Sequence, residues 1–214
     1  MKKPAIAILC LVLGTALAGG EKKGFSPPPA AHAKTYPAQE THTDEKVSIA
    51  IDPFDMPDKT SIFRVNYRAH DLLPIRIIVS NDGDDTLMLT DLKVVYITVK
   101  REKIEPAASE DIYRRLAKLN RRPDQPRVSP IPLPKRKIQS ISKDDVAEIS
   151  DAMFAPVPVT AHSTNSGFLF FDISDVETPL AGAHVYISGL KVNGKELFYF
   201  DIPVEKYLRS QPVK

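Results

Sequence analysis

The feature that most constrains the fold of this chain is a series of short segments in which apolar and polar residues alternate. In residues 73–80, every second residue from Leu73 to Val79 is apolar, whereas Arg76 and Ser80 lie on the other face. A period of two is the side-chain period of a β-strand with one buried face. Clusters of Asn, Asp, Gly and Pro separate this segment from others like it. The sequence therefore predicts a mainly β protein.

About eight or nine strands are expected between residues 46 and 208, a number typical of an antiparallel β-sandwich. Their expected positions are residues 47–51, 61–67, 73–80, 86–89, 92–100, 154–160, 166–173, 183–191 and 195–202. Residues 166–173 are apolar on both faces, which is typical of a central strand covered on each side. Phe171 alternates with Leu169 and Ile173, so we expect it to be buried in the core.

Two turns fix the expected pairing of strands. Asn193-Gly194 is a strong signal for a two-residue hairpin turn, and such a turn places Ile187 opposite Phe200 and Lys191 opposite Glu196. It also places Val185 opposite Ile202, so that apolar residues meet apolar residues.

The second turn covers residues 81–85, whose sequence is Asn-Asp-Gly-Asp-Asp. A five-residue loop there sets Val79 opposite Leu87, whereas a two-residue turn sets Val79 opposite Thr86. Because the first register matches apolar faces, we expect it.

The middle of the chain, about residues 101–153, interrupts the strand pattern. Ser109 can cap a helix from Glu110 to about Leu119, and residues 143–153 form a second, acidic, helical segment. Between them, residues 121–137 contain five prolines and six basic residues against one acidic residue. Repeated proline excludes both helix and central strand. We expect an insertion within one sandwich domain, because the region has too few apolar residues for a core of its own.

The N-terminus has the pattern of a secretory signal peptide. Lys2 and Lys3 precede an apolar run over residues 6–13, and Ala16-Leu17-Ala18 is a small-x-small cleavage site. The apolar run falls well short of the roughly 20 residues that a membrane-spanning helix needs. These features predict a signal peptide over residues 1–18 and a periplasmic or secreted product. The following residues, 19–45, are rich in proline and small polar residues and are expected to form a disordered leader before the domain at 46–208.

Cysteine content and charge set further limits. The single cysteine, Cys10, lies inside the apolar run, so cleavage after Ala18 leaves no cysteine and no disulfide. An alternative in which Cys10 is the acylated first residue of a lipoprotein would leave too short an apolar run. Cleavage removes two of the 29 basic residues and none of the 27 acidic ones, which leaves a net charge of zero. This balance gives no reason to expect a nucleic-acid or membrane partner.

We predict that the chain is cleaved after Ala18 and released in soluble form, because the small residues at this site follow a short apolar run. N-terminal sequencing of the exported product should begin at Gly19. A lipid-modified Cys10 or an intact Met1 would contradict the prediction.

Residues that could act in catalysis or bind a metal are present, but they are far apart in the sequence. The five histidines are His32, His42, His70, His162 and His184, and no two have the close spacing of a zinc site. Residues 81–85 could offer oxygen ligands to calcium, but they lack the glutamate and alternating spacing of a calcium loop, and the same residues suit a tight turn. No Gly-x-Ser-x-Gly nucleophile motif occurs. The sequence therefore predicts no catalytic residue, no metal and no cofactor.

The basic residues that border the proline-rich run are the candidate partner-binding residues. They are Arg121, Arg122, Lys135, Arg136 and Lys137. Such a cluster could bind another envelope protein with an acidic surface, an anionic polymer or lipid head groups. In the alternative interpretation the segment is a solvated loop, balanced by the acidic residues at 144–151.

Two segments resemble recurring pieces of bacterial secreted immunoglobulin-like domains. One is LPIRIIVSNDG (residues 73–83), a strand that ends in an Asn-x-Gly loop, and the other is SGFLFF (residues 166–171), a glycine-aromatic strand. The whole chain also resembles uncharacterised exported bacterial proteins with this layout. The resemblance implies an immunoglobulin-like antiparallel β-sandwich, here with a helical, proline-rich insertion, and it implies no catalytic residues.

The resemblance and the lack of a catalytic motif in the sequence together predict a non-catalytic binding or structural module of the bacterial cell envelope, rather than an enzyme. The alternative is a secreted enzyme whose site assembles from separated loops. A deep pocket with convergent Asp, His or Ser side chains would favour that alternative.

Overall fold

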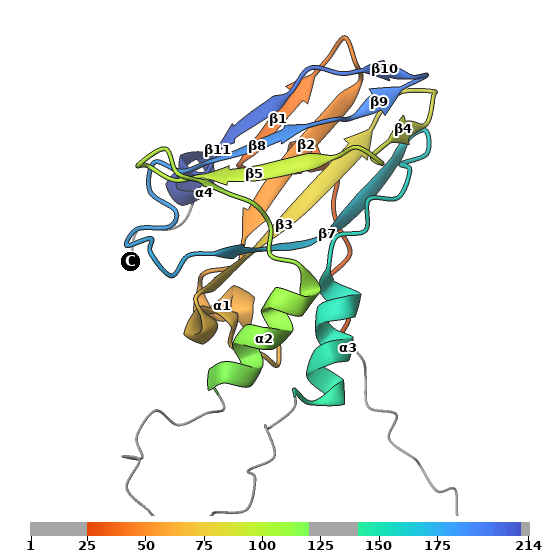
Figure 1. The fold of residues 1–214 in the computed structure, drawn as a ribbon. Coiled ribbons are helices and arrows are strands. Elements are labelled where there is room, and N and C mark those ends of the chain that lie inside the picture. The colour runs from red at the N-terminus through yellow and green to blue at the C-terminus, as the bar shows by residue number, and fades with distance from the viewer. Residues whose placement is uncertain (1–24, 120–140, 211–214) are drawn as a thin grey trace, which may run out of the picture.

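A computed structural model describes residues 25–119 and 141–210 of the chain (Figure 1). The strands are β1 (Gln39–His42), β2 (Val47–Pro53), β3 (Leu72–Asn81), β4 (Leu87–Met88), β5 (Lys93–Ile97), β6 (Lys103–Ile104), β7 (Ser163–Asp172), β8 (His184–Ser188), β9 (Lys191–Val192), β10 (Lys195–Glu196) and β11 (Phe200–Pro203). The helices are the 3-10 turns η1 (Ala33–Thr35) and η2 (Tyr67–His70), and the α-helices α1 (Pro57–Thr60), α2 (Ser109–Leu119), α3 (Lys143–Ala152) and α4 (Glu205–Ser210). The protein is mainly β, as predicted.

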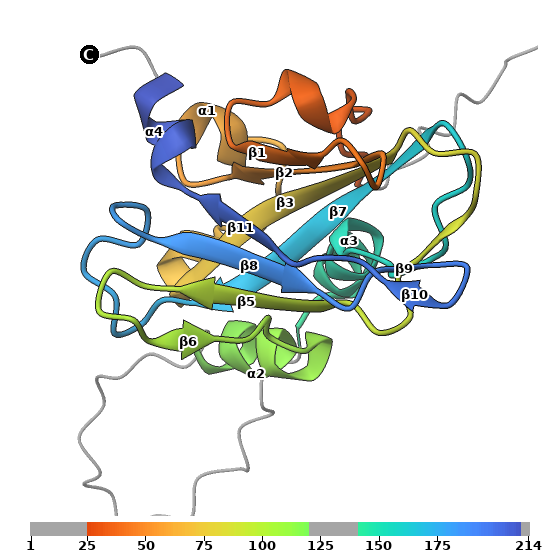
Figure 2. The same ribbon diagram turned by 90° about the horizontal axis from the view of Figure 1, so that it is seen from above.

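The strands form three antiparallel sheets. Sheet A has the order β1-β2-β3-β7, sheet C has the order β11-β8-β5-β6, and the small sheet B has the order β10-β9-β4. Every strand pair in these sheets is antiparallel. In Figure 2, seen from above, β5, β8 and β11 of sheet C cross over the strands of sheet A.

The main core lies between sheets A and C. Sheet A contributes alternate residues of β2 and β3, such as Ile49 and Ile77, and sheet C contributes fully buried residues such as Tyr96, Ile187 and Phe200. The alternation of apolar residues in these strands therefore places one face of each strand in the main core, as expected from the sequence.

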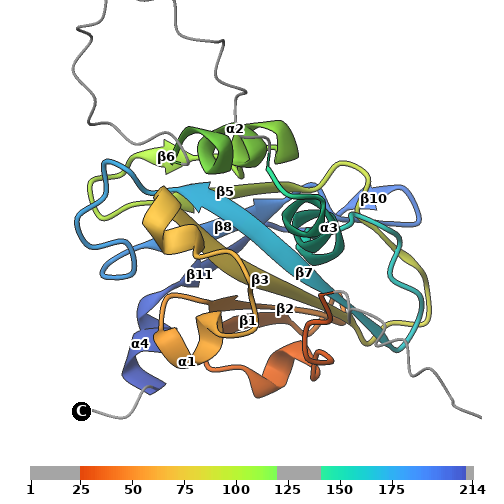
Figure 3. The same ribbon diagram turned by 90° about the horizontal axis from the view of Figure 1, so that it is seen from below.

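A second apolar cluster covers the other face of sheet A. When the molecule is seen from below, α3 lies in front of β7 (Figure 3), and both α2 and α3 contribute buried residues to this cluster. In β7, Phe168 and Phe170 belong to this cluster, whereas Leu169 and Phe171 belong to the main core. The expected two-sided burial of this segment is confirmed. β7 is nevertheless the last strand of sheet A rather than a central one, and within residues 25–119 and 141–210 its outer side is bridged only by Pro106 and Met153.

The 193–194 hairpin has the predicted register. Glu196 pairs with Lys191 across the β9–β10 turn, and further along Phe200 pairs with Ile187. Asn193 and Gly194 both have positive φ values, 50° and 78°, as a two-residue turn of this type requires.

The predicted pairing across residues 81–85 is wrong. β3 pairs with β2 on one side and with β7 on the other, so it has no free edge for β4. The chain instead leaves sheet A, and β4 pairs with β9 in sheet B. The Asn81 side chain fixes this exit, because its oxygen accepts a hydrogen bond from Gly83 N (2.9 Å) and its amide donates to Asp85 O (2.7 Å).

Two further expected strands are also absent from the described residues. Residues 61–67 form turns that lead into η2, and their buried side chains, Phe63 and Tyr67, join the second apolar cluster. Residues 154–160 make only isolated bridges, such as Leu87 with Val159. In the second case Pro156 and Pro158 remove the donors that a strand ladder needs.

The prediction that residues 19–45 form a disordered leader is wrong for residues 25–45. Residues 25–45 contain η1 and β1, and β1 pairs with β2 in the register Gln39 to Ala50. Ala33 and Ala38 are completely buried. Residues 1–24, including the expected signal peptide, lie outside the described residues. Among the helices of the described part, none has the length and apolar character to cross a lipid bilayer.

Candidate functional site

The basic residues singled out from the sequence, Arg121, Arg122, Lys135, Arg136 and Lys137, lie outside the described residues. Their expected acidic counterparts are described. In α3, Asp144 forms an ion pair with Arg64 at 2.8 Å, and Glu148 is 2% exposed. Glu148 is therefore inside the protein rather than on a surface that could balance a solvated loop.

The described residues form an open groove of about 740 Å³ beside α2. It is lined by His70, Asp71, Glu105, Pro106, Ala107, Asp111, Arg114, Arg115 and Asp172. These residues come from the end of η2, the chain after β6, one side of α2 and the end of β7. In the sequence, Arg121 comes shortly after Leu119, the last residue of α2.

Ion pairs hold both arginines of the groove. Arg115 binds Asp172, and Arg114 binds Asp111 at 2.7 Å. Burial opposes ionisation of Asp172, but hydrogen bonds from Ser174 and the charge of Arg115 outweigh it, so that the pKa of Asp172 is lowered. The groove is therefore a surface of fixed, mixed charge at neutral pH.

His70 and Asp71 bring the end of η2 to the groove. Asp71 has a left-handed backbone (φ 57°) and its carbonyl accepts a hydrogen bond from Ile173 N (2.9 Å), which fixes the start of β3 to the end of β7. The Nδ1 atom of His70 is buried and has no hydrogen-bond partner among the described residues.

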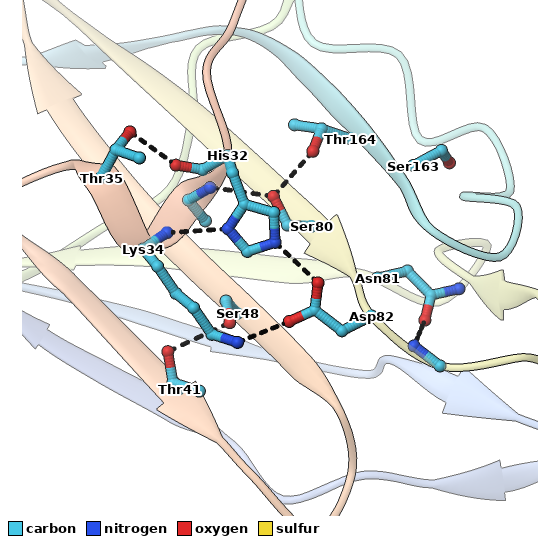
Figure 4. A network of polar contacts seen from close by, with 12 residues as sticks. His32, Lys34, Thr35, Thr41, Ser48, Ser80, Asn81, Asp82, Ser163 and Thr164 are labelled. Atoms are coloured by element: carbon cyan, nitrogen blue, oxygen red, sulfur yellow. Dashed lines mark hydrogen bonds and ion pairs between the residues drawn. The ribbon is translucent and has the colours of Figure 1, made fainter.

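A second polar cluster joins residues 32–35 to the end of β3 (Figure 4). The Asp82 carboxylate binds His32 Nε2 at 2.7 Å and Lys34 Nζ at 2.6 Å. The hydrogen bond from Lys34, with help from His32, lowers the pKa of Asp82 despite partial burial. Nearby, Ser80 Oγ accepts a hydrogen bond from Ala33 N (2.9 Å) and contacts Thr164 Oγ1 (2.8 Å).

This cluster contains Ser, His and Asp but is not arranged as a catalytic triad. His32 Nδ1 accepts a hydrogen bond from Lys34 N (3.2 Å), so its Nε2 carries the proton and donates to Asp82. Neither ring nitrogen is left to take a proton from Ser80. The cluster therefore anchors one segment to another.

Three other histidines also face carboxylates. His42 contacts Glu40 (3.2 Å) and Glu45 (2.9 Å) and stacks on the Phe200 ring at 3.8 Å. The same two glutamates accept hydrogen bonds from the backbone beside β11: Glu45 from Phe198 N (3.1 Å) and Glu40 from Asp201 N (2.8 Å). His162 contacts Asp84, and His184 contacts Asp201.

Two carboxylates of the 81–85 loop, those of Asp82 and Asp84, face basic groups. Asp82 binds His32 and Lys34, and Asp84 binds Lys46 at 3.1 Å. The hydrogen bond and charge of Lys46 lower the pKa of Asp84. Across residues 25–119 and 141–210, no group of three or more His, Cys, Asp or Glu side chains could hold a metal ion.

The groove beside α2 was not anticipated from the sequence. Its residues are as far apart as His70 and Asp172, and neither the helical period nor the strand period links them. The local signal that was available was a pair of arginines in the expected helix 110–119, next to the basic run that begins at Arg121.

The comparisons with known proteins leave the function open. No protein-family model and no curated protein matches this sequence. A crystal structure of a functionally unknown protein from Listeria monocytogenes EGD-e aligns over 73% of this chain and 71% of its own, with 11% identity and a TM-score of 0.31. A likeness this distant carries no argument about fold or function.

Proposed function

We propose that this chain is a non-catalytic binding module of the bacterial cell envelope, exported to the periplasm or secreted, and built on an immunoglobulin-like β-sandwich. Two antiparallel sheets with a common core support the architectural part of the proposal. The export part rests on the signal-like pattern of residues 1–18. The chain resembles exported proteins with the same layout in its strand and turn segments.

The observation that carries the binding role is the charged groove beside α2. It is open, it is about 740 Å³ in volume, and its arginines are held by neighbouring carboxylates. Fixed charges of both signs recognise a charged macromolecule through complementarity. Arg121 and Arg122 follow α2 closely in the sequence, and we assign them to the same partner. That partner is another envelope protein or an anionic polymer.

Site-specific photo-cross-linking tests this role. A photoreactive amino acid at Arg114 should capture a partner in the native envelope, whereas the same group at Lys195 should not. Lys195 is an exposed residue of β10, at the far end of the molecule from α2 (Figure 1). Equal capture from both positions, or from neither, would contradict a partner at the groove.

Replacement of the five basic residues, Arg121, Arg122, Lys135, Arg136 and Lys137, by Ser should abolish partner recovery. We expect the free energy of unfolding to change by no more than about 0.5 kcal/mol, as for surface substitutions in general. A protease should also cut within residues 121–137 while the domain stays folded. Unchanged partner recovery would remove these residues from the binding site, and a large loss of stability would show that they pack on the domain.

The enzyme alternative rests on the same groove, where His70 lies with three aspartates, Asp71, Asp111 and Asp172. In that case His70→Asn should remove an activity and leave partner capture at Arg114 intact. The binding proposal expects the reverse dependence, in which Arg115→Ala weakens capture by the photoreactive group at position 114.

A further inference from the structure

Residues 25–38 lie across the outer face of sheet A, and we call this segment the strap. It contacts β2 and β3 through η1. Ala33 packs, fully buried, against Ala50 of β2 and Ile78 of β3. At its start, the Phe25 ring stacks on Phe63 with a centroid separation of 5.3 Å. The strap therefore covers a face that would otherwise be open.

Side chains rather than a backbone ladder hold the strap. Among the described residues, a single main-chain hydrogen bond joins the strap to the strands beneath. In it, Ile51 N of β2 donates to the carbonyl of Ala38, the last residue of the strap. The other contacts are point contacts: Arg76 donates to Pro28 O (2.6 Å), and Ser80 Oγ accepts from Ala33 N (2.9 Å). At the edge, Asp82 binds His32 and Lys34, as Figure 4 shows.

The surface under the strap has the composition of a protein interface. It presents an arginine, aromatic rings, a hydroxyl and a carboxylate around the buried apolar residues Ala50 and Ile78. The strap buries Arg76 to 4% exposure, and its Nε has no hydrogen-bond partner within the described residues. Covering a cation in this way carries a desolvation cost, which is recovered when the strap leaves. Release of the strap would therefore return Arg76 to water together with the apolar side chains of Ala50 and Ile78.

We propose that this surface is a peptide-recognition site, that the strap is its resident occupant, and that it binds the same segment of a second copy of the chain. A second copy carries the matching groups by definition: an aromatic ring at Phe25, a carbonyl at Pro28, and the sequence His32-Ala33-Lys34. Exchange of an identical segment between copies needs no new contact. The β1–β2 ladder begins at Gln39 and remains within each copy.

A peptide of residues 25–38 carrying a fluorophore tests the recognition step on the full-length chain. Ala33→Arg places a long side chain where a fully buried alanine sits, and it should release the chain's own strap. The peptide should then bind this variant at least about tenfold more tightly than wild type, because in wild type the tethered strap competes at a high effective concentration. Ser26→Arg is the matched control, since Ser26 is an exposed strap residue, and it should bind the peptide no better than wild type.

Two checks keep this result decisive. A peptide that itself carries Ala33→Arg should not bind. If circular dichroism shows that the Ala33→Arg chain is unfolded, the double variant His32→Glu and Lys34→Glu is used instead of it. In this double variant, repulsion between the new glutamates and Asp82 releases the strap. A folded open variant that binds the peptide no better than wild type, or binds both peptides equally, would overturn the recognition site.

Cross-linking tests the second copy. In a Cys10→Ser background, one chain carries Thr35→Cys and another carries Asp84→Cys; both residues are exposed, and neither makes the anchoring contacts above. A thiol cross-linker added to a concentrated mixture should give a dimer joined between positions 35 and 84, identified by mass spectrometry. Excess free peptide should suppress it. A mixture that gives no such dimer would overturn exchange between copies.

Discussion

Phe171→Ala should lower the free energy of unfolding by about 3–5 kcal/mol, the usual cost of removing a buried phenylalanine side chain. The Phe171 side chain is fully buried in the main core, and its ring lies 5.4 Å from the ring of Tyr96 on the opposite sheet. Truncation leaves a cavity between sheets A and C that the paired strands cannot easily close. The chain contains no tryptophan, so unfolding in urea is best followed by far-ultraviolet circular dichroism.

Phe198→Ala is the matched control for this measurement. Its side chain is 76% exposed, so the same truncation should change the stability by no more than about 0.5 kcal/mol. If the denaturation midpoints of the two variants coincide, Phe171 does not face the shared core.

Glu148→Ala should have the next largest effect. The buried Glu148 carboxylate accepts hydrogen bonds from Arg64 N (2.6 Å), Val65 N (3.2 Å) and Tyr67 Oη (3.1 Å). Burial and the nearby Glu148 charge raise the pKa of Tyr67 well above its ordinary value, so its hydroxyl remains a donor. Hydrogen bonds to a charged acceptor contribute about 1.5–3 kcal/mol each and do not add fully when they share one acceptor, so we expect a loss of about 3–4 kcal/mol.

Asp151→Ala provides the comparison on the same helix. Asp151 is exposed near the C-terminal end of α3, where a negative charge is unfavourable, so its removal should leave stability unchanged or slightly raised. Glu148→Gln keeps one acceptor oxygen and should fall between the two. Equal stability of Glu148→Ala and Asp151→Ala would show that residues 64–67 do not depend on α3.

Features that depend on local periods could be predicted from the sequence. The β9–β10 turn follows from Asn193-Gly194, and the two faces of β7 follow from the alternation around Phe171. Helix α2 follows from the apolar spacing of residues 110–119, although it begins at Ser109, whose hydroxyl donates to Glu110 and does not cap the helix as expected. Helix α3 is expected over residues 143–153, and Ser142 caps it by accepting a hydrogen bond from Asp145 N at 3.0 Å. Each of these depends on residues that are close in the chain.

Features that depend on single contacts between distant residues could not be predicted. The strap is held by pairs such as Arg76 with Pro28 and Ser80 with Ala33, which are nearly 50 residues apart and follow no period. Residues 61–67 alternate like a strand, yet Glu148, more than 80 residues away, takes up two of their backbone donors. The groove beside α2 is assembled in the same manner, so its residues carry no common signal in the sequence.

The glutamates that flank His42 determine how the side of the molecule where β1 meets β11 behaves toward other chains. A strand at the edge of a sheet usually offers free N–H groups, on which a neighbouring molecule can build another strand. Here the donors of Phe198 and Asp201 are already taken by the carboxylates of Glu45 and Glu40. An incoming strand would have to displace two charged acceptors and then lie beside them. This edge is therefore protected from fibre-like growth, without a covering helix or an additional strand.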